Sequence, residues 1–451
     1  MGIPCYFSQL IRRHKAVVVK YRCEQATNFC LDSNSIVYDA VRDLPYTGDD
    51  TEYEAKIIAL VCARIAGYIA QVRPKRVCIA FDGVPPMAKM KQQRERRHKS
   101  RLEPRTGWET VQITPGTKFM KKLDEAVHAH FEPTRGKYEF LKITTSDEPG
   151  EGEHKIFEWL RTNPGGDTFV YGLDSDLIIL ALHHLKYGKI KLLREAPAFA
   201  KDQGLQLLDA NLLATQINSL MGADKVPDYV FITLFLGNDF MPHFPALNLR
   251  TRGLDVLLAT YKSVVGSDRL FDGTINWPVV QRFVAALAKR ETGDFAKEYA
   301  DRNQRQVENT PENKPMVRRE VEHYINPPSP GWEDRYYRAL LKMDAQNTAQ
   351  LCRDFYDILT WNVQYYTTGC PDWDLYYPHM YPPLLRDLAK FQYAPRQERP
   401  TQPKSSVDLL KFVMPAQCAH YSAIEYTPEP QDEPEMHWAF CTFLWEAHLL
   451  F

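Results

Sequence analysis

The sequence lacks the features that mark several large classes of protein. Although 44% of its residues are hydrophobic, no uncharged apolar run approaches the roughly 18–20 residues of a transmembrane helix. Its nine cysteines are scattered without a CxxC pair, which argues against a disulfide framework and against a zinc knuckle. Charged residues arrive early at the N-terminus, so there is no apolar signal core. We therefore expect an intracellular protein without membrane contacts, in the cytoplasm or, as a second option, the nucleus.

An excess of one charge sign is also lacking, because 56 Lys and Arg oppose 57 Asp and Glu. The two signs are unevenly distributed, however. Residues 1–140 contain 24 Lys and Arg against 16 Asp and Glu, a net charge of +8, and residues 141–451 contain 32 against 41, a net charge of −9. Such asymmetry indicates an anionic partner for the N-terminal part.

Apolar segments that end in acidic residues alternate with helical patterns in the first part of the chain. This alternation predicts an α/β fold with a mostly parallel central sheet flanked by helices. The expected strands lie within 27–38, ending at Asp32, and at Arg76–Phe81 and Thr168–Gly172. The expected helices are 54–72, 117–131, Glu151–Leu160 and Asp176–His184.

The second part of the chain has a different composition. Sixteen of the 31 prolines lie in the last 141 residues, together with many Tyr and Trp. We expect an α/β core over 1–265 and a mainly helical, aromatic-rich second region over 266–451 that packs on it. Within this region, Ala349–Trp361 is a predicted helix and Ala394–Ser406 a predicted exposed loop.

Acidic residues follow the apolar segments at the points where a parallel sheet binds ligands. Four of them each follow a strand-like or buried segment, and three more lie at the expected helix starts. The set, called here the carboxylate cluster, is Asp32, Asp82, Glu151, Glu153, Asp174, Asp176 and Asp239. Seven carboxylates cannot lie together ionised without cations, and oxygen ligands suit Mg²⁺ or Mn²⁺. We expect two such ions, which is the arrangement that supports in-line phosphodiester hydrolysis.

Each acidic residue also has a simpler explanation. A single Asp after a strand is usually a helix cap or a turn residue, and acidic residues in a first helical turn complement the helix dipole. The joint occurrence of seven at corresponding positions is what favours a site.

A basic segment begins a few residues after Asp82. Residues 89–101, KMKQQRERRHKSR, contain seven Lys or Arg in thirteen positions. Such a run is by default a solvated helix face or a nuclear-localisation-like string. The basic quartet Lys89, Gln93, Arg96 and Arg97 nevertheless falls at i, i+4, i+7 and i+8, on one helical face. These side chains suit a compact anion such as a terminal phosphate, because Arg binds phosphate oxygens in a bidentate manner.

The chain resembles the Xrn family of 5′→3′ exoribonucleases across most of its length. The segments that carry the resemblance are LDSNSIVYD (31–39), FDGVPPMAKMKQQRERR (81–97), EPGEGEHKI (148–156), YGLDSDLIIL (171–180), FLGNDFMPHFP (235–245) and GCPDWDLYYPHMYPPLLRDL (369–388). They cover both core regions of the family without the long C-terminal extensions of its cytoplasmic members. The resemblance implies a PIN/FEN-like fold.

The family's functional residues fall on positions of this sequence that have the matching residue types. The resemblance makes the carboxylate cluster catalytic and metal-binding, with two Mg²⁺ ions or Mn²⁺ in their place, and makes the basic quartet the 5′-monophosphate pocket. It also implies base stacking between Tyr38, where the family has histidine, and Trp373. Leu375 replaces a second tryptophan.

The implied function is processive 5′→3′ hydrolysis of single-stranded RNA with a 5′-monophosphate, releasing nucleoside 5′-monophosphates in mRNA decay. RNA would then be the partner of a protein that acts as a monomer. Two alternatives stay open: a catalytically weak or inactive RNA-binding member of the same fold, and a flap-type structure-specific nuclease. Against the second, no glycine-rich hairpin follows Asp239.

Overall fold

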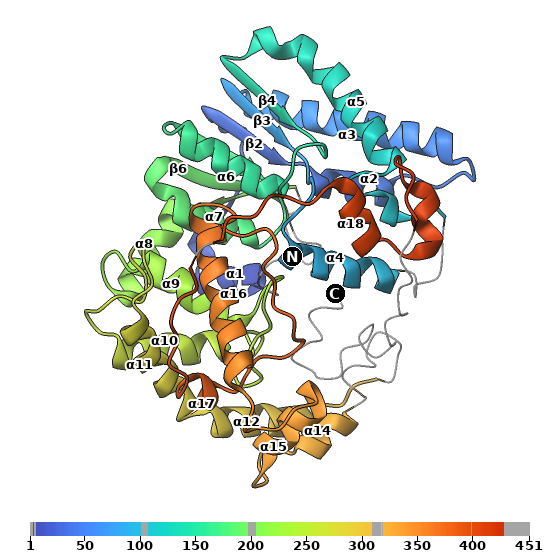
Figure 1. Ribbon diagram of the computed structural model, residues 1–451. Helices are drawn as coiled ribbons and strands as arrows, with labels where there is room; N and C mark the ends of the chain where they lie inside the picture. The colour runs from blue at the N-terminus through green and yellow to red at the C-terminus, as the bar shows by residue number, and fades with distance from the viewer. Residues whose placement is uncertain are drawn as a thin grey trace.

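A seven-stranded sheet forms the centre of the first region (Figure 1). The computed structural model describes residues 3, 6–100, 107–196, 204–308, 317, 319–397 and 399–427, without the side chains of 99 and 100. In spatial order the strands are β1 (Val18–Lys20), β7 (Leu205–Asp209), β6 (Lys189–Glu195), β5 (Asp167–Tyr171), β2 (Asn28–Asp32), β3 (Arg76–Ala80) and β4 (Phe140–Thr144). Strands β2 to β6 are parallel, and β7 and β1 add an antiparallel edge. The mostly parallel sheet expected from the sequence is thus confirmed.

Helices cover both faces of this sheet. They are α2 (Asn34–Asp43), α3 (Asp50–Val72), α5 (Lys118–Phe131), α6 (Gly152–Thr162), α7 (Asp176–His184) and α8 (Ala210–Met221), and a further helix, α4 (Met87–Ser100), follows β3. Side chains alternate along β2, because successive residues of a strand point to opposite faces. Phe29 and Leu31 join the core under α3 and α5, and Cys30 joins the core under α6 and α7.

Helix α3 is long and apolar enough, by length and composition, to cross a membrane, and no other helix in the described ranges is. Its Asp49 N-cap accepts a hydrogen bond from the backbone of Glu52. The helix buries one stripe of apolar side chains, including Ile57, Val61 and Ile65, against the sheet. We interpret α3 as a core helix because that stripe follows the period of an amphipathic helix.

The remainder of the chain is mainly helical. Its helices are α9 (Val226–Thr233), α10 (Gly253–Val264), α11 (Trp277–Ala288), α12 (Glu291–Asn303), α14 (Glu320–Ile325), α15 (Trp332–Tyr336), α16 (Ala349–Thr367), α17 (Leu385–Leu388) and α18 (Ser406–Val413), and α1 (Tyr6–Arg13) packs beside them. The apolar segment Tyr229–Leu236, which precedes Asp239, is helical and consists of the end of α9 and a short 3₁₀ turn.

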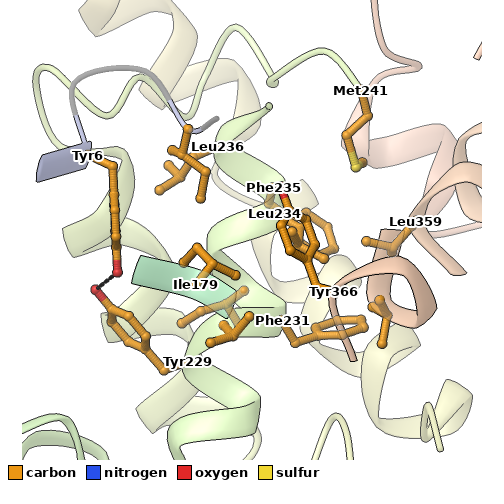
Figure 2. Close-up of a cluster of buried hydrophobic side chains, with 14 of the residues drawn as sticks. Tyr6, Ile179, Tyr229, Phe231, Leu234, Phe235, Leu236, Met241, Leu359 and Tyr366 are labelled. Atoms are coloured by element: carbon orange, nitrogen blue, oxygen red, sulfur yellow. Dashed lines mark hydrogen bonds between the residues drawn. The ribbon is translucent and has the colours of Figure 1, made fainter. Parts of the chain in front are cut away.

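The helical part packs on the α/β part through one continuous hydrophobic core, as expected. Figure 2 shows this core where Ile179 of α7, Phe231 of α9 and Leu359 and Tyr366 of α16 meet. Helix α16 runs alongside α7 (Figure 1), and it extends six residues beyond the predicted end at Trp361. A domain boundary near residue 265 stays a prediction, because the core is shared by both parts.

The proline-rich stretch 394–405 forms neither helix nor strand at the residues that are described. It leads into α18, which begins with a capping box formed by Ser405 and Asp408. Helix α18 packs on α4, where the Arg94 guanidinium lies 5.3 Å from the centre of the Phe412 ring. The C-terminal described segment therefore supports the helix that carries the basic quartet.

Candidate metal and phosphate site

Three carboxylates of the cluster lie at the carboxyl ends of neighbouring strands. Asp32 is the last residue of β2, Asp82 follows β3 and Asp174 follows β5. Strand β2 pairs with β3 on one side and with β5 on the other, so the three strand ends are adjacent. The chain order reverses here, because β3 and β4 extend the sheet in one direction from β2 and β5 and β6 in the other. Ligands bind in the crevice at such a switch point.

The N-terminus of α6 brings two more carboxylates to the same place. Glu151 is its N-cap and Glu153 lies in its first turn. Between them, the backbone N–H of Gly152 donates to Asp82 Oδ1 at 2.7 Å. A Cβ at position 152 would lie 2.9 Å from Asp32 Oδ1, so only glycine allows the helix to approach this closely. The N-terminal end of the helix dipole also favours the negative charge gathered there.

Asp176 and Asp239 complete the cluster from deeper positions. Asp176 is the first residue of α7 and is only 1% exposed. Asp239 follows the 3₁₀ turn after α9, and so it arrives from a helical segment and not from a strand. A single pocket, which we call the strand-end pocket, is lined by the other five carboxylates: Asp32, Asp82, Glu151, Glu153 and Asp174. The structure thus gathers all seven predicted acidic residues around one edge of the sheet.

The basic quartet lines the same strand-end pocket. Lys89, Gln93, Arg96 and Arg97 lie on its wall together with Tyr38 of α2, and the pocket encloses about 350 Å³. The helical spacing therefore selected a face of α4 that points at the carboxylate cluster. A cationic wall and an anionic wall thus share one cavity.

Burial and mutual repulsion disfavour the ionised form of several carboxylates. Burial raises the pKa of Asp32 well above its usual value, and the neighbouring Asp82 and Asp174 raise it further. Burial and the charge of Asp239 raise the pKa of Asp176 to about 7. A divalent cation among these oxygens would reverse both effects, because an opposite charge stabilises the ionised form.

The donor set fits a hard divalent cation. Glu153 Oε2 is buried and has no hydrogen-bond partner in the part of the chain that the structure describes. Ligand atoms of Glu151, Glu153 and His154 lie within 4.8 Å of one another. Carboxylate oxygens are the preferred ligands of Mg²⁺ and Mn²⁺. The cluster is therefore a candidate metal centre with an unsatisfied buried oxygen.

Lys89 is the internal cation of this centre. Its Nζ lies 2.7 Å from Glu151 Oε2 and 2.7 Å from Asp239 Oδ2. Burial lowers the pKa of Lys89, but Asp239 and Glu151 raise it well above its usual value. Burial raises the pKa of Asp239, but the positive charges around it, chiefly the Lys89 ammonium, together lower it by a larger amount. The net pKa of Asp239 therefore lies below its usual value. Lys89, a member of the basic quartet, thus lines the pocket and is also paired with two carboxylates of the cluster.

The two arginines of the quartet differ in their surroundings. The Nε of Arg97 donates to Thr114 Oγ1 at 2.7 Å, and burial lowers the pKa of Arg97 to about 10, so it stays cationic near neutral pH. Arg96 is exposed on the same face of α4. Arg97 is therefore held in place by the protein, and Arg96 is accessible to a ligand in the pocket.

Trp373 lies apart from Tyr38. It lines a neighbouring cavity of about 430 Å³ together with His154 and Tyr365, and its carbonyl accepts a hydrogen bond from the Met87 backbone. Tyr38 is 37% exposed and lines the strand-end pocket. The structure does not bring the two rings into one cavity, so their base-stacking roles stay predictions.

Sequence reasoning missed two tyrosines that touch the carboxylate cluster. The hydroxyl of Tyr365 donates to Glu151 Oε1, and that of Tyr366 donates to Asp176 Oδ1, each at 2.8 Å. Both tyrosines lie on α16, within the stretch Gly331–Tyr366 that was expected to contain helix but after its clearest segment, Ala349–Trp361. The many aromatic residues in this part of the sequence were the available signal that the segment is buried. A single sequence, however, does not show which residue about 200 positions away a side chain contacts.

An α/β protein whose strand ends deliver a carboxylate cluster to an arginine-lined pocket has the layout of a metal-dependent phosphodiester hydrolase. The comparisons with known proteins specify the family. The family model described as the XRN 5′-3′ exonuclease N-terminus matches residues 1–107 and 98–196, and that described as the Xrn1 helical domain matches residues 223–326 and 318–428. The chain belongs to the Xrn family, and the expected fold class is confirmed.

Among curated proteins, the chain is similar to several named 5′-3′ exoribonuclease 2. It is 29% identical to the one from Eremothecium gossypii and 28% identical to the one from Saccharomyces cerevisiae, with 66% of this chain aligned in each case. The alignment to the Drosophila melanogaster homolog is 24% identical over 95% of this chain and 65% of that protein. The chain spans about two fifths of the length of the two fungal relatives, 42% and 39%.

Proposed function

We propose that the chain is a divalent-cation-dependent 5′→3′ exoribonuclease that degrades single-stranded RNA from a 5′-monophosphate. The observation that carries the proposal is the shared strand-end pocket, in which the basic quartet faces five carboxylates. A terminal phosphate bound by the arginines places the first phosphodiester next to the carboxylate cluster. The relatives named 5′-3′ exoribonuclease 2 support this proposal.

The residues have distinct roles in this proposal. Arg96 and Arg97 bind the 5′-phosphate by charge-assisted hydrogen bonds. The carboxylate cluster would hold two Mg²⁺ ions, or Mn²⁺, which when bound supply activation of water and stabilisation of the leaving oxygen. Lys89 spans both groups, because it pairs with Glu151 and Asp239 while lining the pocket.

A single-stranded substrate fits this proposal, because a duplex cannot present its first bases for stacking. Each cleavage releases a nucleoside 5′-monophosphate and leaves a new 5′-phosphate on the shortened RNA, so the pocket meets the same chemical group at every step. This repetition fits processive action. We place the activity in mRNA decay, in a monomeric cytoplasmic enzyme.

The experiment compares three RNAs of one sequence, labelled at the 3′ end, that carry a 5′-monophosphate, a 5′-hydroxyl or a 5′-triphosphate. With Mg²⁺, only the monophosphorylated RNA should decay rapidly, and EDTA should stop the decay. Equal decay of all three RNAs would overturn the phosphate pocket. Binding of RNA without decay would favour the catalytically inactive alternative, and cleavage only at junctions with a duplex would favour the flap-type alternative.

A further inference from the structure

One face of α16 is turned toward the carboxylate cluster. Asn362, Tyr365 and Tyr366 occur at i, i+3 and i+4, so they share a side of the helix. Their exposed fractions are 0%, 2% and 1%. The helix lies beyond residue 265, whereas every carboxylate of the cluster precedes that residue. This face is therefore a contact through which the helical region reaches the metal centre.

Each of the three side chains contacts the cluster or a residue next to it. Tyr365 donates to Glu151 Oε1 and Tyr366 donates to Asp176 Oδ1. Asn362 Oδ1 accepts from Asn238 at 3.1 Å. Asn238 directly precedes Asp239, and its own Oδ1 accepts hydrogen bonds from the backbone of Phe240 and Met241. The two tyrosines thus orient Glu151 and Asp176 directly, and Asn362 stabilises the turn that carries Asp239.

The two phenols are suited to hold carboxylates in one orientation. A phenol hydroxyl is a protonated hydrogen-bond donor near neutral pH. With Lys89 on Glu151 Oε2, both oxygens of Glu151 have a fixed partner. One oxygen of Asp176 is engaged by Tyr366, which fixes the direction of the other.

Aromatic packing fixes the positions of the two tyrosine hydroxyls. The Tyr365 ring stacks on His154 with 3.6 Å between ring centres, and Phe240 packs edge-on against both tyrosines. Figure 2 shows Tyr366 within the buried apolar cluster where α7, α9 and α16 meet. Side chains locked by packing in this way hold a ligand carboxylate without further ordering when a cation binds.

We propose that Tyr365 and Tyr366 are positioning residues that set the divalent-cation affinity of the carboxylate cluster. The inference rests on the proposed function in so far as the cluster must bind a cation. Helix α16 then does more than cover the α/β core, because its two hydroxyl groups set the affinity of the carboxylate cluster for a divalent cation. Hydrogen-bond partners of metal ligands generally change metal affinity or activity by about 10–100-fold when they are removed.

The test removes only the hydroxyls, with the variants Tyr365→Phe, Tyr366→Phe and the double variant. Mn²⁺ binding to the full chain, measured by electron paramagnetic resonance of the free ion, gives the dissociation constant. We expect each single variant to raise it about tenfold and the double variant to raise it by up to about 100-fold. Tyr356→Phe is the matched control, because Tyr356 is a buried tyrosine of the same helix whose hydroxyl donates to the Leu388 carbonyl. The control should leave Mn²⁺ affinity within about twofold of the unsubstituted chain.

A second readout separates positioning from general damage to the fold. The Mg²⁺ concentration that gives half-maximal RNA decay should rise in the tyrosine variants, and excess Mg²⁺ should restore the maximal rate. Equal Mn²⁺ affinity in all variants would overturn the inference alone, and so would an equal loss in Tyr356→Phe. If the unsubstituted chain bound no Mn²⁺, the proposed function would fail together with the inference.

Discussion

The two regions of the molecule contribute to the candidate metal centre in different ways. The α/β part supplies six of the seven carboxylates, at strand ends and helix starts, where the backbone fixes their direction, and the seventh, Asp239, follows α9. Helix α16 supplies no carboxylate of the cluster and contributes hydroxyl and amide groups from one face. The ligands therefore follow from the topology of the sheet, whereas the groups that orient the ligands follow from packing between the two regions.

This division of roles implies that substitutions in the two regions differ in severity. Loss of a ligand from the α/β region should abolish the chemistry, and loss of a contact from the helical region should only weaken cation binding. Substitutions of side chains on the wall of the strand-end pocket should reduce activity less than loss of a ligand does. The size of each reduction should depend on how directly the side chain contacts the RNA.

Asp174→Asn should be the most damaging substitution. Asp174 follows β5 next to Asp32, and an amide at this position removes a negative charge that the cations need while it preserves size. We expect Mg²⁺-dependent RNA decay to fall by about 10³-fold or more, since metal-assisted charge stabilisation is worth several kcal/mol. Single-turnover decay rates measure the change. Near-normal rates at saturating Mg²⁺ would show that the strand-end carboxylates are not the ligands.

Replacing Arg96 and Arg97 together by Ala should abolish selectivity for the phosphorylated RNA end. Hydrogen bonds to charged groups contribute about 1.5–3 kcal/mol, so the loss of these guanidiniums should weaken productive binding of monophosphorylated RNA, with KM rising about 10–100-fold. Arg94→Ala is the control, because Arg94 lies on the same helix but packs over Phe412 of α18. Steady-state rates on RNAs with phosphate and hydroxyl groups at the 5′ end give the selectivity. If Arg94→Ala lowered it equally, net charge and not the pocket would govern binding.

Lys89→Met should raise the affinity for a divalent cation and lower the affinity for 5′-phosphorylated RNA. The ammonium neutralises Glu151 and Asp239, so its removal leaves more negative charge for a cation and less positive charge for a phosphate. We expect Mn²⁺ to bind about tenfold more tightly and 5′-phosphorylated RNA about tenfold more weakly, as measured by metal titration and by fluorescence anisotropy in EDTA. A decrease in both affinities would show that Lys89 only supports the fold of the site.

Tyr38→Ala should be the mildest of the four changes. A stacked base is worth about 1–3 kcal/mol, and Tyr38 is exposed at the pocket wall. In steady-state assays on RNA the variant should show a KM about tenfold higher, whereas Tyr38→Phe, which keeps the ring, should behave like the unsubstituted chain. An equal effect of Tyr38→Phe would assign the role to the hydroxyl and not to stacking.

The sequence-based predictions succeed where the pattern is local and clear, and they fail where the pattern is weak or where two distant segments meet. Helix α7 begins and ends where its periodicity predicts, and the acidic residues are found at the strand ends because parallel strands place their carboxyl termini at one edge. Strand β4, in contrast, is mostly exposed or half-buried at its start and carries no acidic signal, so it was not predicted. The link between Tyr366 and Asp176 depends on how α16 packs against α7, and neither local periodicity nor composition encodes that contact.

The fate of a label on the terminal phosphate decides whether the two halves of the strand-end pocket act on one bound RNA end. A single-stranded RNA whose 5′-monophosphate is radioactive is incubated with the full chain and Mg²⁺, and the first labelled product is identified by thin-layer chromatography. If the basic quartet and the carboxylate cluster act together, the label must appear first in a nucleoside 5′-monophosphate. Label released as inorganic phosphate or in a longer oligonucleotide would contradict this arrangement.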